Sequence, residues 1–343
     1  MAENKKITIY DVAKASGVSR QTVSRVINNR PDVAYETRTR VLDVIKKMDY
    51  RPNAVAQSLS RQKSYLLGVV SAGLKYIGPS VTLKGIVDQA ELMGYGLILK
   101  TVSSFDDHDV VPILKYFQSH QVDGIIWAVP EIGENRKWLK IDKPNIGIPI
   151  IFMDMAQDDR VSIVVIDNIQ GARIATRHLI DRGCKHIGHI SGPMDWLDSR
   201  QRKLGWNLTM VEAGFSTSEK MCTEGNWSSK SGKNAFHQLI EQFPEMDGLF
   251  VANDQMALSV LQSAHELDIS IPKKLKVVGF DGIPESEFYS PSLTTIYQNL
   301  ENLGCTAVNE LIQLIEKGTT PNYENDHKFV KIQPQLIIRQ STQ

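Results

Sequence analysis

Side chains able to recognise nucleic-acid bases gather on one side of a short segment near the N-terminus. At about 100° per residue, a helix over residues 20–28 has a polar face opposite an apolar face. The polar face holds Arg20, Gln21, Ser24, Arg25 and Asn28, and the apolar face holds Val23, Val26 and Ile27. In the major groove of DNA, arginine can bind guanine, and glutamine or asparagine can bind adenine. The segment is therefore predicted to read base edges.

A second group of polar residues follows buried apolar runs in the rest of the chain. Asp154, Asn253 and Asp281 each close such a run. Ligands of open parallel sheets bind beyond the carboxyl ends of the strands, so these residues are candidates for a ligand site. Their carboxylate and amide groups suit the paired hydroxyls of a sugar.

Signals for catalysis, metals and phosphate are weak. The stretch from Gly68 to Lys75 superficially resembles a phosphate loop, but its lysine comes one position late and no Ser or Thr follows it. Cys184, His186 and His189 are close in sequence, but strand alternation places the two histidines on opposite faces. No nucleophile elbow is recognisable. We therefore expect no catalytic residue, no metal site and no cofactor.

The base-reading segment lies within a predicted group of three short helices. Thr8 can cap a first helix, with Asp11 in the position of a capping box, and that helix ends at Gly17. Ser19 can cap the second helix. A third helix is predicted over residues 34–48, with an apolar stripe at Val41, Val44, Ile45 and Met48. This order predicts a helix-turn-helix head.

Length and charge divide the chain into unlike parts. Its 343 residues exceed the usual domain of about 150 residues. Residues 1–63 hold 13 Lys and Arg against 6 Asp and Glu, whereas the remainder holds 26 against 33. A basic module on a mildly acidic body favours DNA as the partner of the first module. No apolar stretch reaches the roughly 18 residues of a membrane helix, and no secretory signal is recognisable, so we expect no membrane partner and a cytoplasmic location.

The rest of the chain alternates short apolar runs with helical stretches, which predicts parallel βαβ units. Strands are expected at 66–72, 97–102, 124–129, 150–153, 163–166, 186–190, 249–252, 277–280 and 335–339. Helices are expected at 82–93, 169–182, 202–213 and 253–267, among others. No internal repeat is visible.

The run from Ile9 to Asn28, followed by Tyr50-Arg-Pro-Asn53 and Val55-Ala-Gln-Ser-Leu59, resembles the head of the lac-repressor (LacI/GalR) family of bacterial transcription regulators. The pattern is closest to that of the galactoside-responsive repressor after which the family is named. The resemblance covers the whole chain. It implies an all-α helix-turn-helix head and an α/β body of two parallel-sheet lobes, like the periplasmic sugar-binding proteins.

The implied boundaries are a DNA-binding head at 1–50, a hinge at 51–63 and an effector-binding and dimerisation domain at 64–343. Within the body, the N-lobe is expected at about 64–166 and 296–325, and the C-lobe at about 167–295 and 326–343. The resemblance implies that three chain crossings join the two lobes.

The resemblance also implies which residues contact double-stranded operator DNA. In the head these are Thr8, Ser19, Arg20, Gln21, Thr22, Ser24, Arg25 and Asn28. In the hinge, Asn53 can cap a helix too short to be stable by itself, so we expect it to fold on DNA. The resemblance implies that Ala56 and Leu59 of two such hinge helices enter the minor groove, with Leu59 wedged between base steps.

For the effector, the resemblance implies a sugar bound between the lobes. The expected contacts are Ala72, Tyr76, Asp154, Asp198, Arg202, Trp227, Asn253, Asp281 and Gln298. A galactoside or a similar mono- or disaccharide is the first interpretation. Ala72, Tyr76 and Asp198 depart from the residues of galactoside-binding members, which leaves the identity of the sugar open.

The leading hypothesis is a repressor whose operator affinity a small inducing sugar controls. Alternatives are a corepressor-type regulator, an architectural DNA binder that senses nothing, and a sugar-metabolising enzyme with a DNA-binding appendage. We expect a homodimer, because one head reads only half of a palindromic site. The chain ends at Gln343, shortly after the last predicted strand and without a heptad tail, so the dimer is the expected final state, located at the bacterial nucleoid.

Overall fold

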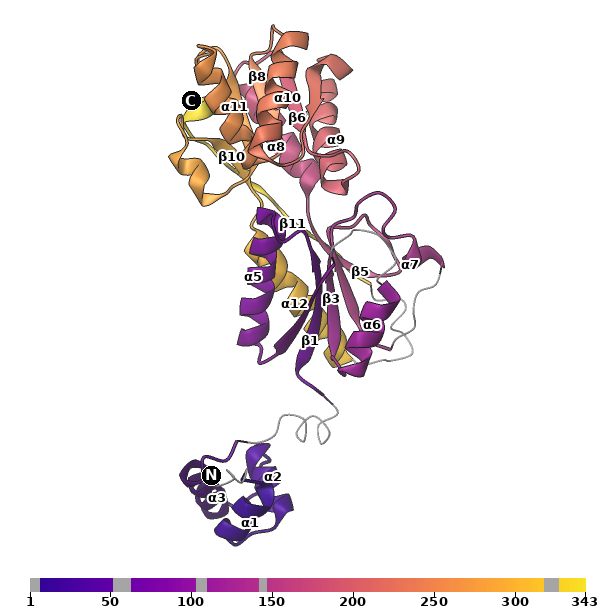
Figure 1. Ribbon diagram of the computed structural model, residues 1–343, viewed down its shortest axis with the longest axis vertical. Helices are drawn as coiled ribbons and strands as arrows, with labels where there is room; N and C mark the ends of the chain where they lie inside the picture. The colour runs from indigo at the N-terminus through magenta and orange to yellow at the C-terminus, as the bar shows by residue number, and fades with distance from the viewer. Residues whose placement is uncertain (1–6, 52–62, 103–109, 142–146, 318–326) are drawn as a thin grey trace, which may run out of the picture. The chain divides into compact units, whose positions relative to one another are not determined.

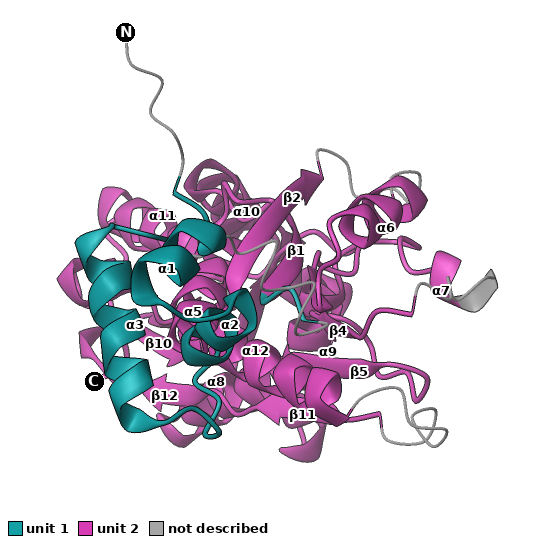
Figure 2. Ribbon diagram, turned by 90° about the horizontal axis from the view of Figure 1, so that it is seen from below, with its two compact units in different colours: residues 1–65 teal, residues 66–343 magenta. Residues whose placement is uncertain are grey.

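The computed structural model describes residues 7–51, 63–102, 110–141, 147–317 and 327–343. The chain forms two compact units, Met1–Tyr65 and Leu66–Gln343, drawn in separate colours in Figure 2. The predicted hinge contacts Asn53, Ala56 and Leu59 lie outside the described residues.

The head consists of α1 (Ile9–Ser16), α2 (Arg20–Ile27) and α3 (Tyr35–Lys47) (Figure 1). Thr8 and Asp11 form the predicted capping box, since the Thr8 amide donates to Asp11 Oδ2 at 2.9 Å and the Asp11 amide donates to Thr8 Oγ1 at 3.4 Å. Gly17 ends α1 in the left-handed conformation, with φ 66°. Ser19 accepts the Thr22 amide at 3.1 Å and so begins α2. The predicted helix starts are confirmed.

The apolar faces of the three helices meet in one small core. Its buried members are Val12, Ala13, Val23, Val26 and Val41, and Ile27, Val44, Ile45 and Met48 pack against them. This confirms the apolar stripes predicted for the second and third helices. The core holds α2 with its polar face toward solvent.

The N-lobe of the body is a parallel sheet between helices (Figure 1). Its strand order is β11 (Phe329–Ile332), β5 (Ser162–Ile166), β4 (Ile150–Met153), β3 (Gly124–Ala128), β1 (Leu66–Ala72) and β2 (Gly96–Val102). One face packs against α5 (Ile77–Leu92) and α12 (Leu300–Lys317), and the other against α6 (Val110–Ser119) and α7 (Trp138–Ile141). Gly85 of α5 permits a close crossing with α12, because a Cβ there would lie 2.2 Å from the Glu301 carbonyl oxygen.

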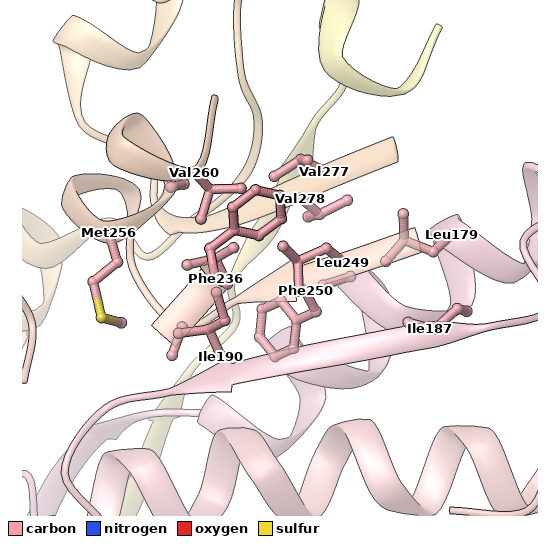
Figure 3. Close-up of a cluster of buried hydrophobic side chains, with 14 of the residues drawn as sticks. Leu179, Ile187, Ile190, Phe236, Leu249, Phe250, Met256, Val260, Val277 and Val278 are labelled. Carbon is pink, nitrogen blue, oxygen red and sulfur yellow. The ribbon is translucent and has the colours of Figure 1, made fainter. Parts of the chain in front are cut away.

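The C-lobe repeats this design with one antiparallel edge strand. Its order is β12 (Gln335–Ile337), β10 (Thr294–Tyr297), β9 (Lys276–Asp281), β8 (Gly248–Val251), β6 (Ile187–Ser191) and β7 (Cys222–Glu224), with β12 antiparallel to β10. The helix pairs α8 (Asn168–Asp181) with α9 (Leu197–Glu212), and α10 (Ser229–Gln242) with α11 (Asp254–Glu266), cover the sheet. Figure 3 shows the core that they enclose. Short 3₁₀ turns lie at Glu219–Met221, Pro284–Phe288 and Gln340–Thr342.

The two-lobed α/β architecture and the three crossings are confirmed, whereas the limits of the lobes are partly wrong. β10 belongs to the C-lobe sheet, so the returning N-lobe segment begins after Tyr297 rather than at residue 296. β11 pairs with β5 in the N-lobe, although residues 326–343 were expected in the C-lobe. Both errors arise because strand partners distant in sequence, not local pattern, decide which sheet a short strand joins.

None of the helices in the described parts of the chain combines the length and the apolar composition that crossing a bilayer requires.

Candidate functional site

The polar face of α2 is available to a macromolecular partner. Arg20, Gln21 and Arg25 are exposed, while Val23 and Val26 on the opposite side are buried. Arg25 forms an ion pair with Asp32 at 3.3 Å, with about half of each side chain exposed. Such an exposed pair is weak and screened by salt, so phosphate or guanine can replace the aspartate.

Most of the other predicted DNA contacts of the head lie at helix ends, namely at the N-termini of α1 and α2 and at the C-terminus of α2. Thr8 and Ser19 are N-caps, and Ser19 Oγ lies 2.9 Å from Thr22 Oγ1. Asn28 ends α2, and its Nδ2 donates to Ser24 Oγ at 3.3 Å. These short polar side chains therefore already use part of their hydrogen-bonding capacity within the head. The longer side chains of Arg20, Gln21 and Arg25 are exposed and can reach a partner.

A cavity opens between the two lobes, at the carboxyl ends of strands from both sheets. Of the nine predicted effector contacts it brings together eight, namely Tyr76, Asp154, Asp198, Arg202, Trp227, Asn253, Asp281 and Gln298. Ala72 does not line it. It is 1% exposed and packs in the N-lobe core on the side of α6, because strand alternation puts it on the same face as Val70.

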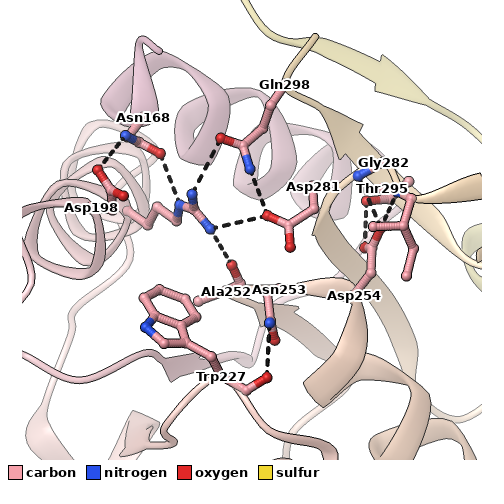
Figure 4. Close-up of polar contacts among 12 residues, drawn as sticks. Asn168, Asp198, Trp227, Ala252, Asn253, Asp254, Asp281, Gly282, Thr295 and Gln298 are labelled. Atoms are coloured by element: carbon pink, nitrogen blue, oxygen red, sulfur yellow. Dashed lines mark hydrogen bonds and ion pairs between the residues drawn. The ribbon is translucent and has the colours of Figure 1, made fainter. Parts of the chain in front are cut away.

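Arg202 is the centre of the polar network in this cavity, and its partners Asn168, Ala252, Gln298 and Asp281 are labelled in Figure 4. Its guanidinium donates to Asn168 Oδ1 at 2.9 Å, to the Ala252 carbonyl at 2.6 Å and to Gln298 Oε1 at 3.4 Å. Its Nη1 also lies 3.5 Å from Asp281 Oδ1. With 4% of its surface exposed, Arg202 is a fixed, buried donor rather than a mobile surface charge.

The loop after β9 holds Asp281 in place. Asp254 accepts the amides of Gly282 and Ile283 at 2.9 Å and the Thr295 hydroxyl at 2.6 Å. Gln298 donates to Asp281 Oδ1 at 2.6 Å. Asp254 therefore positions Asp281 by holding the backbone of the two residues that follow it. The sequence analysis did not predict this role.

Trp227 forms an aromatic wall of the cavity. Asn253 donates to its carbonyl at 3.0 Å and accepts the Met256 amide at 3.0 Å, so Asn253 ties the tryptophan loop to the start of α11. Gly192 makes room for the indole, because a Cβ there would lie 2.2 Å from it. The nitrogen and the oxygen of the Asn253 side-chain amide are thus both engaged, so Asn253 is a positioning residue.

Three cavity residues have left-handed backbone conformations that are unfavourable for side chains other than glycine. The φ angles are 48° for Asp154, 71° for Trp227 and 114° for Asp281. Such conformations persist where the surrounding structure imposes them, and they gather at binding sites. All three residues line the cavity, so the strained backbone directs their side chains at a candidate binding site.

Asn168 and Trp196 are among the lining residues that sequence reasoning missed. Asn168 begins α8 directly after β5 and donates to Asp198 Oδ1 at 3.1 Å. The rule that identified Asp154 could have found it, because it also follows a buried strand. Trp196 precedes α9, which starts at Leu197 rather than at the predicted Arg202. The longer helix places Asp198 and Arg202 one turn apart on the same face.

Burial makes the cavity carboxylates weaker acids. It raises the pKa of Asp281 to about 6, even though Arg202 and Gln298 favour the charged form. Burial, and next the charge of Asp198, raise the pKa of Asp154 to about 7 against the opposing effect of Arg136 and Arg202. Burial also raises the pKa of Asp198. Each of these carboxyl groups is therefore protonated more readily than an exposed aspartate, because the cavity does not fully compensate its negative charge.

Asp154→Asn is expected to make the ligand-free protein less sensitive to alkaline pH. Because folding raises the pKa of Asp154 from 3.8 to about 7, its contribution to stability is present below pH 4 and is lost as pH rises through 7. The variant should gain on the order of 2 kcal/mol relative to wild type between pH 5 and pH 8, since one pKa unit is worth about 1.4 kcal/mol. Urea unfolding at both pH values measures this, with exposed Asp195→Asn as control. An equal pH dependence in both variants would contradict it.

Among the residues that the structure describes, no three His, Cys, Asp or Glu side chains are grouped in a way that could hold a metal ion. His189 is fully buried and stacks on Phe250 and Trp206 in the C-lobe core.

A helix-turn-helix head, with a two-lobed body that encloses a polar cavity, defines the class of ligand-responsive DNA-binding proteins. Residues 8–53 match the model of bacterial regulatory proteins of the lacI family, and residues 176–342 match a periplasmic binding protein-like domain. The chain belongs to the LacI family.

Similar proteins cover nearly the full length. Catabolite control protein A of Priestia megaterium is 31% identical over 98% of this chain and 99% of its own length. The lactose operon repressor of Escherichia coli K12 is 30% identical over 90% of this chain and 85% of its own length. The HTH-type transcriptional repressor PurR of Histophilus somni (strain 2336) is 32% identical over 97% and 98%.

Solved structures agree with these relatives. The lac repressor dimer bound to operator and the anti-inducer ONPF superimposes with a TM-score of 0.86, at 28% identity over 98% of this chain and 99% of that one. A complex of the regulator CelR with cellobiose gives a TM-score of 0.71, at 26% identity over 98% and 99%. The chain is accordingly a DNA-binding transcriptional repressor with a ligand-binding effector domain, and not an enzyme.

Proposed function

We propose that the chain binds operator DNA as a homodimer and that a small sugar in the lobe cavity lowers its operator affinity. The observation that carries the proposal is the buried Arg202, held by Asp281 and Gln298 beside the Trp227 indole. Forked donors and acceptors match the paired hydroxyls of a sugar, and an indole matches its apolar C–H face. The similar CelR–cellobiose complex supports this class of ligand, and a galactoside or a similar mono- or disaccharide remains our first candidate.

The dimer follows from the geometry of DNA reading. One head carries one base-reading helix, so a palindromic operator requires two heads related by two-fold symmetry. The similar lac repressor structure is a dimer on its operator, which supports the same assembly here.

The switch is proposed to act through lobe orientation. Asp154 follows an N-lobe strand, whereas Arg202 and Asp281 belong to the C-lobe, so a ligand that contacts both groups favours one orientation of the lobes. That orientation is proposed to separate the two hinge segments and weaken DNA binding. A coupling of about 1–3 kcal/mol is enough for a tenfold to hundredfold change in affinity.

The test uses the full chain and a duplex selected from a randomised palindromic library. Fluorescence anisotropy measures duplex affinity with and without galactose, lactose, cellobiose and glucose at fixed salt. At least one sugar should weaken binding tenfold or more. Tighter binding would indicate a corepressor, and no change with any sugar would support a DNA binder that does not sense sugars.

Gln21→Ala is expected to cost about 1–3 kcal/mol of operator affinity at one base step in each half-site, because the exposed side chain can bind an adenine edge. Affinities for duplexes substituted at single positions measure the effect. A uniform loss over all sequences would assign Gln21 to phosphate contact instead, and Glu36→Gln on α3 is a control outside the base-reading helix.

Leu59→Ala is expected to lower operator affinity and to shrink the sugar effect, because part of the coupled hinge interaction is already lost. This prediction rests on the family resemblance, since Leu59 lies outside the described residues. The same anisotropy titration measures both quantities. Full affinity together with a full sugar response would exclude the hinge as the route of coupling.

A further inference from the structure

Within the part of the chain that the structure describes, two of the three aspartates that line the cavity form no ion pair. The ion pairs of the described residues join Asp281 to Arg202, but they include neither Asp154 nor Asp198. The hydrogen bond described for the Asp198 carboxylate comes from the neutral amide of Asn168, at 3.1 Å. Both carboxylates line the same cavity, Asp154 from the N-lobe and Asp198 from the C-lobe.

The charge of Arg202 favours the ionised form of all three carboxylates, but its ion pair is with Asp281. Its hydrogen bonds go to Asn168, the Ala252 carbonyl and Gln298, which are labelled with Asp281 in Figure 4. Arg136, the other buried arginine that acts on Asp154, donates to the Val129 carbonyl. Burial therefore dominates and raises the pKa of both Asp154 and Asp198. The nearby negative charge that adds to this effect is Asp198 for Asp154, and Glu131 for Asp198. A ligand that brought positive charge would relieve this repulsion.

Aromatic rings beside these carboxylates also favour a cation. Tyr76 meets Trp196 edge to face at 5.6 Å, and Trp196 meets Trp227 at 5.8 Å, and all three line the cavity. The electron-rich faces of such rings attract ammonium groups. Trp227 itself is 7% exposed, and its indole N–H has no hydrogen-bond partner among the described residues, so it can donate to a ligand hydroxyl once the side chain adjusts.

We propose that the effector is an amino sugar, a hydroxylated ring that carries a protonated amine, and that the ammonium lies between Asp154 and Asp198 beside the aromatic rings. This inference rests on the proposed sugar-sensing function and specifies its ligand class. Arg202, Asp281 and Gln298 would bind the hydroxyls. A neutral sugar would leave the two carboxylates uncompensated.

Isothermal titration calorimetry of the full chain tests the charge directly. The probes are glucosamine, galactosamine and mannosamine, each compared with its neutral parent hexose and with its N-acetyl derivative, which keeps the nitrogen but not the charge. At least one hexosamine should bind ten times or more tighter than both neutral counterparts at pH 6.5. Equal or tighter binding of the neutral compounds, or no binding of any hexosamine, would overturn the proposal.

Asp198→Asn separates charge from shape. The variant keeps an oxygen that can accept the Asn168 amide, so we expect a folded protein whose preference for the amine falls below threefold. Asp195→Asn, three residues earlier and exposed outside the cavity, should keep the full preference. If Asp198→Asn fails to fold, Asp154→Asn provides the same comparison from the other lobe. An unchanged preference in a folded variant would remove its carboxylate from the ammonium site.

The two proposals fail in different ways. If a neutral hexose releases the operator and binds as tightly as its amine, sugar sensing stands and the amino-sugar inference is wrong. If a hexosamine binds with the expected preference but operator affinity does not change, the ligand class stands and the proposed control of DNA binding is wrong.

Discussion

Replacing Arg202 by alanine is expected to abolish the effector response while operator binding stays nearly intact. The guanidinium joins Asn168, the Ala252 carbonyl, Gln298 and Asp281, so its removal disrupts these four contacts at once. The loss leaves Asp281 buried without its cation, and breaking such a pair costs about 3–5 kcal/mol. Ligand affinity should fall at least a hundredfold, because about 1.4 kcal/mol is tenfold.

Operator anisotropy with increasing sugar measures the response, and urea unfolding measures the stability of the variant. Arg200→Ala is the matched control, since Arg200 lies on the same helix, outside the cavity lining, and donates to the Asp195 carbonyl at 2.7 Å. A normal response in Arg202→Ala would exclude Arg202 from the effector site. Loss of operator binding in a folded Arg202→Ala protein would show that the residue also supports the DNA-binding state.

Replacing Trp227 by alanine is expected to have the second-largest effect. The indole is buried against Gly192 and beside Trp196, so its removal opens a hole in the C-lobe and should cost roughly 3–5 kcal/mol of stability. Ligand affinity should also fall, because the apolar wall that covers the sugar ring is lost. Operator affinity should change little, since this residue faces the lobe cavity.

Trp227→Phe separates the contribution of the aromatic face to ligand affinity from that of the indole N–H. Phenylalanine keeps an aromatic face but has no donor, so it should retain more ligand affinity than alanine and less than wild type. Calorimetry with the best-binding sugar gives the three affinities. Equal affinity in wild type and Trp227→Ala would show that the ligand does not contact this ring.

Local patterns predicted the head well. The caps at Thr8 and Ser19, the stop at Gly17 and the buried valines of α2 depend on residues within one or two turns of each other. Such contacts are set by spacing and by side-chain chemistry, which are visible in the sequence. The polar face of α2 is exposed for the same reason, because its opposite face is the apolar one.

The body was predictable in its elements but not in all of its connections. Strands β1 and β4 have the predicted limits, since each is an apolar run between polar segments. β7, β10 and β11 are too short and too mixed to stand out, and their sheets depend on partners elsewhere in the chain. β11 illustrates this, because it pairs with a strand about 160 residues earlier in the chain and thereby returns to the N-lobe.

By itself, the sequence determined the exposed polar face of α2, the alternating α/β body and the strand-end aspartates that line the cavity. These features follow from periodicity, capping and the rule that parallel strands direct their carboxyl ends to one edge. Only the tertiary structure decided that Ala72 is a core residue, that Asp254 and Asn253 position other groups, and that Asp154 and Asp198 share one cavity in which the arginine forms its ion pair with Asp281. The physical reason is that burial and charge balance depend on groups brought together from both lobes, and no local spacing records those distances.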